Sequence, residues 1–357
     1  MKNHKISLRQ RLGLELFRQE QNLRKSRHEL HTLFWECTLR CNVSCRHCGS
    51  DCRSDSTLRD MPGSDFLRVV DTILPKTDPH KLFIIFTGGE PLMREDLEAL
   101  GRELYRRELP WGIVTNGLML NPRRLESLLC AGIHSVTVSL DGPEEAHNWL
   151  RRHPQSFTKA SEAIRLLART KEIEWDVVTC VNNCNIGHLA DFGNYLASLG
   201  VRHWRIFTIF PAGRAASHPD LQLDNTQFTQ LLEFIASTRK EGNLHLSFAC
   251  EGFLGSYESK VRDHFYHCNA GISVASIRAD GSISGCPSIR ADFSQGNIYQ
   301  DDFWEVWNNR FQVFRNREWA RQGECADCSM FRYCEGNGMH LHDKKGQLTT
   351  CHYHKIV

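Results

Sequence analysis

Fifteen cysteines in a chain of 357 residues constrain this sequence more than any other feature. An odd number cannot pair completely in disulfides, and a chain of this length does not need disulfides to hold a small core together. The densest groups lie near opposite ends, over 37–52 and 325–351. Clustered thiols without a disulfide framework favour metal ligation in a reducing compartment, so we expect a cytoplasmic protein.

The overall composition excludes several classes of protein. Hydrophobic residues make up 41% and charged residues 24% of the chain, as in ordinary globular proteins. The formal net charge of +2 gives no electrostatic case for nucleic acid as a partner. We see no apolar run of about 18 residues and no apolar segment near the N-terminus, so we expect neither a transmembrane helix nor a secretory signal.

Short apolar runs alternate with helical patterns from residue 31 onwards. The runs are rich in β-branched and aromatic residues and are typical of strands: 31–37, 82–87, 111–115, 134–140, 175–181 and 203–209. Six β-α units predict an α/β fold with a parallel sheet, curled into an open, partial (β/α)6 barrel of the TIM type.

The pattern divides the chain into three parts. Residues 1–30 are predicted to form a basic helical arm packed on the surface, with a membrane-surface or partner-binding arm as the alternative. Residues 31–244 form the barrel. Residues 245–357 are expected to form a small cysteine-rich domain with one helix over 301–320 and a thin apolar core, which metal ligation would stabilise.

Cys41, Cys45 and Cys48 form a C-x3-C-x2-C motif directly after the first predicted strand. Three thiolates in one short loop can bind zinc, with a neighbouring His or Cys as the fourth ligand. They can equally hold an iron–sulfur cluster and leave one iron open to another ligand. The loop leaves the first strand at the edge where barrel active sites lie, and residues 87–91 (TGGEP) leave the second strand at that same edge.

Together these two motifs resemble those of the radical S-adenosylmethionine (radical SAM) enzymes. The resemblance implies a [4Fe-4S] cluster on Cys41, Cys45 and Cys48, the catalytic cluster ligands, with S-adenosylmethionine (SAM) on the open iron. It also implies the reaction, in which one electron cleaves SAM to methionine and a 5′-deoxyadenosyl radical, and this radical abstracts hydrogen from a substrate.

The resemblance extends to residues expected to contact SAM. The fourth strand ends in a stretch that looks like the family's S-x-D-G…H-D-x-x-R, with Asn148 in place of the usual Asp. The residues expected at SAM are His47, Gly88, Gly89, Glu90, Asn116, Ser139 and Arg151. Pairing of Arg with a carboxylate is sensible chemistry, while a solvated Arg151 and a plain turn at Asn116 are the alternatives.

Residues 211–215, Cys37 and Cys52 belong neither to the C-x3-C-x2-C motif nor to the residues expected at SAM. Residues 211–215 (PAGRA) resemble a family stretch that shapes the pocket floor, with a structural turn as the alternative. Cys37 and Cys52 flank the motif and are expected to be buried or spare thiols.

The second cysteine group resembles the SPASM extension of radical SAM enzymes, which carries auxiliary [4Fe-4S] clusters. The resemblance implies a distal cluster on Cys325, Cys328, Cys334 and Cys351. All four are present, so at least one auxiliary cluster is expected.

Only part of the ligand set for the proximal cluster of that extension is present. Cys268 and Cys286 flank a predicted β-hairpin that turns at Asp280–Gly281, but Gly338 replaces a further family cysteine. The residues that could substitute are Cys250, His267, His340 and His342. Whether a second auxiliary cluster exists stays open at this point.

The substrate is the least constrained property. Pro287 stands where sulfatase-maturating members carry an acidic residue, which argues against formylglycine formation. We expect a peptide or small protein substrate and an electron donor such as flavodoxin or ferredoxin. The alternatives are a small molecule, such as a tetrapyrrole or an aromatic metabolite, and a non-catalytic zinc scaffold. The HCGSDC and CEGNGMHLH stretches faintly resemble a subgroup associated with small lipoproteins.

Overall fold

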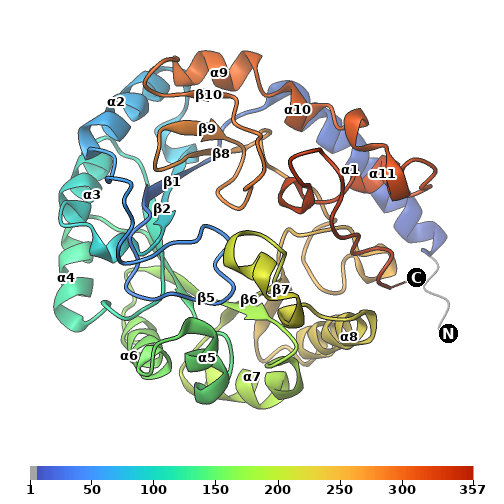
Figure 1. Ribbon diagram of the computed structural model, residues 1–357, viewed down its shortest axis with the longest axis horizontal. Coiled ribbons are helices and arrows are strands. Elements are labelled where there is room, and N and C mark those ends of the chain that lie inside the picture. Colours follow the sequence, from blue (N-terminus) through green and yellow to red (C-terminus); the bar gives the residue numbers. More distant parts are fainter. Residues whose placement is uncertain (1–5, 357) are drawn as a thin grey trace.

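Parallel strands form one curved sheet in the computed structural model, which describes residues 6–356 (Figure 1). Seven parallel strands follow one another in chain order across most of this sheet. They are β1 (Thr32–Thr38), β2 (Phe83–Gly88), β3 (Trp111–Thr115), β4 (Ser135–Ser139), β5 (Glu174–Val181), β6 (His203–Thr208) and β7 (His245–Phe248). The predicted α/β class and open barrel are therefore confirmed, with β7 added beyond the six predicted strands.

Helices cover the outer side of the sheet (Figure 1). They are α2 (Gly63–Ile73), α3 (Leu97–Arg106), α4 (Pro122–Cys130), α5 (Glu144–Arg151), α6 (Ser156–Ala168), α7 (Leu189–Ser198) and α8 (Asn225–Glu241). Local sequence fixes several starts: the Asn121 side chain caps α4, which has Pro122 in its first turn, and Asp224 forms a capping box with Gln227 at α8.

Large aromatic side chains fill the core between the sheet and these helices. The ring of Trp35 on β1 stacks on that of Phe66 on α2, with centroids 4.2 Å apart. A Cβ atom at Gly101 of α3 would lie 2.2 Å from the Trp111 ring, so only glycine lets this helix approach β3. Truncating a buried Trp or Phe to Ala in such a core costs roughly 3–5 kcal/mol.

The sheet continues past β1 into the C-terminal region. Strand β8 (Val274–Ile277) pairs in parallel with β1 and antiparallel with β9 (Ser282–Ser284), which pairs with β10 (Gly296–Asn297). The hairpin predicted between Cys268 and Cys286 is thus present, and Gly281 in its turn has φ of +85°. The division at 244/245 stays a prediction, and one ten-stranded sheet crosses it.

The single helix predicted over 301–320 is wrong. The segment forms α9 (Phe303–Asn309), α10 (Gln312–Arg315) and a 3-10 turn over Glu318–Ala320. The guanidinium of Arg315 donates to the carbonyl oxygens of Trp307 (2.5 Å) and Asn308 (3.0 Å), which would otherwise bond to the next helical turn. A basic side chain thus ends the helix where apolar periodicity alone predicts its continuation.

Helix α1 (Leu8–Arg27) begins with a capping box at Ser7 and lies beside α11 (Phe331–Cys334) in Figure 1. Its Leu14 packs in one cluster with Phe253, Tyr266 and Cys334 of the C-terminal region. Residues 1–5 of the predicted arm fall outside the described residues. In the described part of the chain, each helix is too short or too polar to cross a membrane.

Candidate functional site

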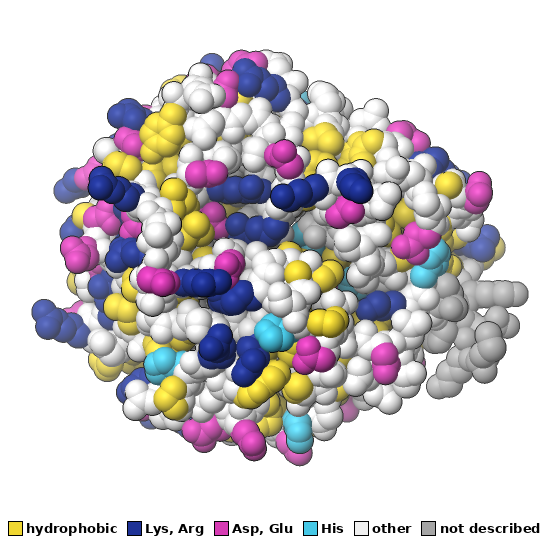
Figure 2. Space-filling view, viewed as in Figure 1, with side chains coloured by type: hydrophobic (Ala, Val, Ile, Leu, Met, Phe, Trp, Pro, Cys, Tyr) yellow, Lys and Arg dark blue, Asp and Glu magenta, His cyan; other side chains and the backbone are white. Residues whose placement is uncertain are grey.

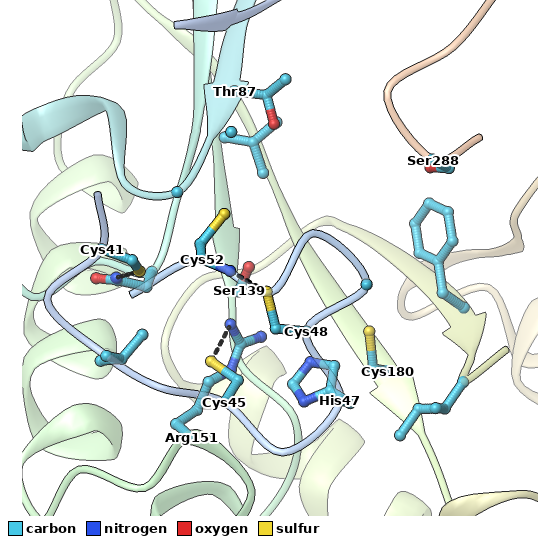
Figure 3. A pocket seen from close by; sticks show the side chains of 18 of the residues that line it. Cys41, Cys45, His47, Cys48, Cys52, Thr87, Ser139, Arg151, Cys180 and Ser288 are labelled. Atoms are coloured by element: carbon cyan, nitrogen blue, oxygen red, sulfur yellow. Dashed lines mark hydrogen bonds between the residues drawn. The ribbon is translucent and has the colours of Figure 1, made fainter. Parts of the chain in front are cut away.

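The C-x3-C-x2-C motif lies in a loop after β1 that we call the barrel loop (residues 39–53). It closes one side of a cavity of about 290 Å³ above the carboxyl ends of the strands (Figure 3). All the residues predicted at SAM line this cavity, with the exception of Glu90: His47, Gly88, Gly89, Asn116, Ser139 and Arg151. Residues predicted from separate motifs are therefore brought to one place, which is the edge of the sheet where barrel enzymes keep their active sites.

Each motif sulfur accepts a hydrogen bond from a different N–H group. The donors are Asn116 Nδ2 to Cys41 (3.9 Å), Arg151 Nη1 to Cys45 (3.8 Å) and the backbone N–H of Cys52 to Cys48 (3.4 Å). Two of these bonds are drawn near Cys45 and Cys48 in Figure 3. Donors aimed at sulfur stabilise thiolates that ligate iron, so the loop fits a metal cluster.

The spacing of the sulfurs favours a cluster over a single zinc ion. In a tetrahedral zinc site with Zn–S bonds of about 2.3 Å, the sulfurs lie about 3.8 Å apart. Among the described residues, three ligand atoms come within 4.8 Å of one another at two places only: His47, Asp141 and Cys180, and Glu324, Cys351 and His354. Neither place holds two cysteines of one motif, so the sulfurs of Cys41, Cys45 and Cys48 do not converge as closely as a single zinc ion requires.

The three thiols differ in their readiness to ionise. A hydrogen bond from the Cys52 thiol lowers the pKa of Cys48 to about 5. Burial raises the pKa of Cys41 to about 12 and also raises that of Cys45. Positive charge from bound iron opposes this cost of burial, which is a second reason why the set suits a metal.

Two arginines from distant segments fasten the barrel loop. Arg214 donates through Nε to the Cys45 carbonyl (2.7 Å) and through Nη1 to the Cys52 carbonyl (2.9 Å) and to Asp51 (2.7 Å). Arg290, which follows the β8–β9 hairpin, pairs with Glu36 of β1 (2.7 Å) and donates to a hydroxyl of the loop. Figure 2 shows Lys and Arg side chains gathered around the middle of this face. The sequence predicts a pocket floor or a turn at residues 211–215, and neither includes the contacts that Arg214 makes with the barrel loop.

Gly88 and Gly89 bring the end of β2 against the chain that enters the loop. A Cβ atom at Gly88, where φ is +125°, would lie 2.2 Å from the Thr38 carbonyl oxygen. At Gly89 it would lie 2.0 Å from the Arg40 carbonyl oxygen. The backbone N–H of Gly89 and of Glu90 donate to those same oxygens, at 2.7 and 2.9 Å. The glycines therefore fix the barrel loop as well as lining the cavity.

The Glu90 carboxylate faces the protein. It accepts hydrogen bonds from Thr115 Oγ1 (2.8 Å) and from the backbone N–H groups of Leu92 (3.1 Å) and Asn116 (2.8 Å). Burial raises its pKa in spite of these bonds. Glu90 therefore ties the end of β3 to β2 and so places the Asn116 side chain at the cavity.

A buried network holds Arg151 at the cavity wall. Arg151 Nε donates to Asp141 (2.6 Å), and His147 Nδ1 accepts from the Asp141 backbone N–H (2.9 Å). Burial alone would raise the pKa of Asp141, but the Arg151 guanidinium outweighs it and holds this pKa well below its usual range. Asp141, His147 and Arg151 are thus linked in one electrostatic network. Arg151 is buried, so the alternative of a solvated Arg151 is wrong.

His47 and Cys180 line the cavity on the side away from Thr87 (Figure 3). Burial lowers the pKa of His47 to about 3, so the imidazole is neutral at physiological pH. Its Nδ1 is buried without a hydrogen-bond partner. A neutral ring with an unused nitrogen at a cavity wall suits a flat, polar ligand such as a nucleobase.

The four cysteines predicted to hold a distal cluster lie in the segment 325–351, which we call the C-terminal array. Cys325 and Cys334 are buried, whereas Cys328 and Cys351 are partly exposed. Asn337 Nδ2 donates to Cys351 Sγ at 3.6 Å. The segment contains only single turns of helix, so its backbone is held by side chains more than by regular structure.

Of the candidate substitutes, Cys250, an exposed residue, is the one whose charge acts on Cys286. Burial raises the pKa of Cys286 to about 12, and the charges of Cys250 and Cys268 add to that rise. The backbone N–H of Gly338 donates to the carbonyl of Glu251 (3.1 Å), beside Cys250. A Cβ at 338 would lie 2.6 Å from the His340 ring, so that ring occupies the space of the missing cysteine side chain.

Two family models match the chain in the regions just described. The model for the radical SAM superfamily matches residues 35–194, and the model for SPASM, an iron-sulfur cluster-binding domain, matches residues 268–329. Residues 35–194 therefore form a radical SAM domain and residues 268–329 lie in a SPASM domain, as the cysteine and glycine motifs predict.

Curated relatives of this chain have two kinds of activity. An AdoMet-dependent heme synthase of Nitratidesulfovibrio vulgaris is 26% identical over 320 residues, which is 85% of this chain and 85% of the relative. Mycofactocin maturase MftC of Mycobacterium ulcerans is 29% identical over 311 residues, which is 86% of this chain and 82% of the relative.

Solved structures of two proteins with bound S-adenosylmethionine share the fold. SuiB of Streptococcus suis bound to S-adenosylmethionine superposes with a TM-score of 0.68 at 15% identity, over 87% of this chain and 73% of that one. Native anSMEcpe with bound AdoMet has a TM-score of 0.70 at 22% identity, over 91% of this chain and 94% of that one.

Proposed function

We propose that this protein cleaves SAM reductively at the barrel loop and uses the resulting radical to modify a peptide or small protein. When bound, the cluster and SAM supply a 5′-deoxyadenosyl radical that takes a hydrogen atom from the substrate. The observation that carries the chemistry is the set of Cys41, Cys45 and Cys48, each with its own N–H donor, at the wall of the strand-end cavity.

Different residues around the cavity would bind different groups of SAM. Arg151 and Ser139 would receive its carboxylate, because the guanidinium lines the cavity while Asp141 fixes its orientation. Backbone groups at Gly88 and Gly89 would receive the amino group. His47 would lie against the adenine. Glu90 acts as a positioning residue, since its carboxylate is fully engaged by protein donors.

The size and charge of the cavity support a peptide substrate. A volume of about 290 Å³ lies at the lower end of the range for small-molecule pockets, and it must also admit the cofactor. Its one Lys or Arg side chain, Arg151, is paired with Asp141, while Arg214 and Arg290 at the loop are paired with Asp51 and Glu36. A single side chain from an extended peptide fits this space, and the mycofactocin maturase relatives agree with that class.

A tetrapyrrole is the second candidate, because the heme synthase relatives match 85% of the chain. Its carboxylates would need cations that are not already paired. The two classes are separated by supplying reconstituted enzyme, SAM and dithionite with either a small peptide or Fe-coproporphyrin III. Consumption of one substrate in step with 5′-deoxyadenosine assigns the class. If neither the peptide nor Fe-coproporphyrin III changes the release of 5′-deoxyadenosine, both substrate classes are rejected.

We also propose three clusters: one on the barrel loop, one on the C-terminal array, and a proximal one on Cys250, Cys268 and Cys286. Three [4Fe-4S] clusters correspond to about twelve irons per chain. Cys250→Ala is expected to lower that count to about eight and to leave 5′-deoxyadenosine formation with dithionite intact. An unchanged iron count would remove Cys250 from the ligand set. A matched Cys184→Ala variant, at an exposed cysteine of the barrel, should keep all twelve.

A further inference from the structure

Helix α1 carries an exposed leucine face. Leu8, Leu12, Leu16 and Leu23 are 84%, 63%, 67% and 59% exposed. At 100° per residue they share an arc of about 80° on the helix. Leu14 lies on the opposite side, buried against the C-terminal region. A helix that is apolar on two opposite sides and covered on one is typical of a binding surface.

The rim of this leucine face is positively charged. Residues 8–27 contain six Lys and Arg against two Glu, a net charge of +4. Both glutamates are already paired, Glu15 with Arg18 and Arg332, and Glu20 with Arg24. Arg9 and Arg27 are exposed, about 20° beyond the arc of the leucines on one side. An anionic partner is therefore favoured, and a second α1 helix of the same charge is disfavoured.

The inner side of α1 is fastened to the C-terminal array. Glu15 accepts a hydrogen bond from the hydroxyl of Tyr333 (2.7 Å) and pairs with Arg332 (2.5 Å), both on α11. Leu14 packs in the same cluster as Cys334. A protein seated on the leucine face would thus lie one helix away from a cysteine of the array.

We propose that the leucine face and its basic rim are the docking surface for a small acidic one-electron carrier protein of the flavodoxin type. The proposal rests on the proposed function, because cleaving SAM consumes one electron that the enzyme must obtain from outside. The reduced carrier would lose that electron, and an iron–sulfur cluster held by the cysteines of the array would accept it. No bond is formed or broken in this transfer.

The size of the surface suits such a partner. A helix of 20 residues is about 30 Å long, which gives a narrow patch with a few apolar contacts. Transient electron-transfer complexes bury less than about 1,200 Å² and depend on charge for their encounter rate. A carrier must also dissociate after each electron transfer, and an interface with only four leucines is small enough to allow this.

The test compares two reductants on the same reconstituted holoenzyme. One assay uses an acidic flavodoxin kept reduced by NADPH and its reductase, and the other uses dithionite. Leu12→Gln/Leu16→Gln and Arg9→Glu/Arg27→Glu are each expected to raise the KM for flavodoxin about tenfold, which is roughly 1.4 kcal/mol. The rate of 5′-deoxyadenosine formation with dithionite should stay at the wild-type value.

The control is Arg102→Glu/Arg123→Glu, which makes the same charge change at exposed residues of α3 and α4, across the molecule from α1 (Figure 1). It should leave the KM for flavodoxin unchanged. Iron content and the circular dichroism spectrum confirm that each variant is folded and loaded.

Three results would overturn the docking site. One is a flavodoxin KM that neither α1 variant changes. Another is an equal loss of 5′-deoxyadenosine formation with flavodoxin and with dithionite, which would mean that the substitutions in α1 impair catalysis or folding. The third is loss of binding to phosphatidylglycerol vesicles with an unchanged flavodoxin KM, which would make the membrane surface the occupant. A wild type that makes no 5′-deoxyadenosine with dithionite would instead reject the proposed function itself.

Discussion

The barrel loop and the C-terminal array both carry several cysteines, yet the protein holds them in different ways. The barrel loop is bonded to the ends of β1 and β2 through Gly88 and Gly89, and Arg214 clamps it from above. The array has only single helical turns, and helix α1 packs against it. The loop is thus shaped by the barrel before iron arrives, whereas the array depends on its metal for much of its order.

The sharpest test of this difference removes one ligand from each region. Cys45→Ala should lower 5′-deoxyadenosine formation more than 1,000-fold, which corresponds to about 4 kcal/mol, because three ligands share the radical-forming cluster. The barrel should keep its melting temperature. Cys334→Ala should expose residues 318–356 to trypsin, because this buried cysteine packs with Leu14.

Iron counts, thermal melts and timed proteolysis measure these outcomes. Cys130→Ala, at an exposed cysteine of α4, is the matched control and should change none of them. If Cys45→Ala unfolds the barrel, or if Cys334→Ala leaves the array as resistant as before, the two regions do not differ in the way described.

Arg214 tests the clamp with a smaller effect. Arg214→Ala removes donors to the Cys45 and Cys52 carbonyls, and loss of such outer contacts typically costs 10- to 100-fold in metal affinity or activity. We expect slower 5′-deoxyadenosine formation and faster loss of iron to a chelator from the barrel loop, measured by time-resolved absorbance. Arg53→Ala, which changes an exposed pair with Asp51 in the same loop, should have little effect.

Acid should destabilise the C-terminal array through His342. Burial lowers its pKa to about 4, and the side chain is only 4% exposed. The ordinary value is about 6.5, so the folded state prefers the neutral ring. The neutral His342 ring therefore makes its full contribution to the free energy of unfolding above pH 6.5. This contribution, at most roughly 3 kcal/mol, is lost as the pH falls toward 4. Proteolysis of residues 318–356 across this range should show the loss, and His342→Asn should flatten it.

Restoring the family cysteine at 338 should have the smallest effect. Gly338→Cys alone is expected to add no iron, because the His340 ring lies where the new side chain must go. Gly338→Cys with His340→Ala opens that space and should change the electron paramagnetic resonance spectrum of the proximal cluster. A changed spectrum in the single variant would show that His340 moves aside freely.

Sequence reasoning succeeded where local pattern carries the information. The first six strands follow from β-branched and aromatic runs such as that around Trp35, and the cysteine and glycine motifs located the cavity. It failed where distant contacts decide. Nothing local to β8 predicts its parallel pairing with β1, and the break of the predicted 301–320 helix depends on Arg315 reaching back to α9. Cys250 lies 18 residues before Cys268, and only the fold brings it near.

The role of Glu90 illustrates a different limit. The motif predicts Glu90 at SAM, but the direction of a carboxylate depends on which donors surround it. Thr115, Asn116 and Leu92 take up its oxygens from neighbouring segments. A motif thus identifies which residues meet, while packing decides which of them faces the ligand.

The parallel pairing of β8 with β1 determines how this protein can be divided. A chain ended at residue 244 would leave β1 with an unpaired edge from Thr32 to Trp35, and a bare apolar edge of this kind invites aggregation. A C-terminal region grafted from a relative would have to supply a strand in register with Thr32 and Leu33. A chimera should therefore take the barrel and the cysteine-rich region from the same protein. A junction that keeps the sheet intact must lie outside both regions.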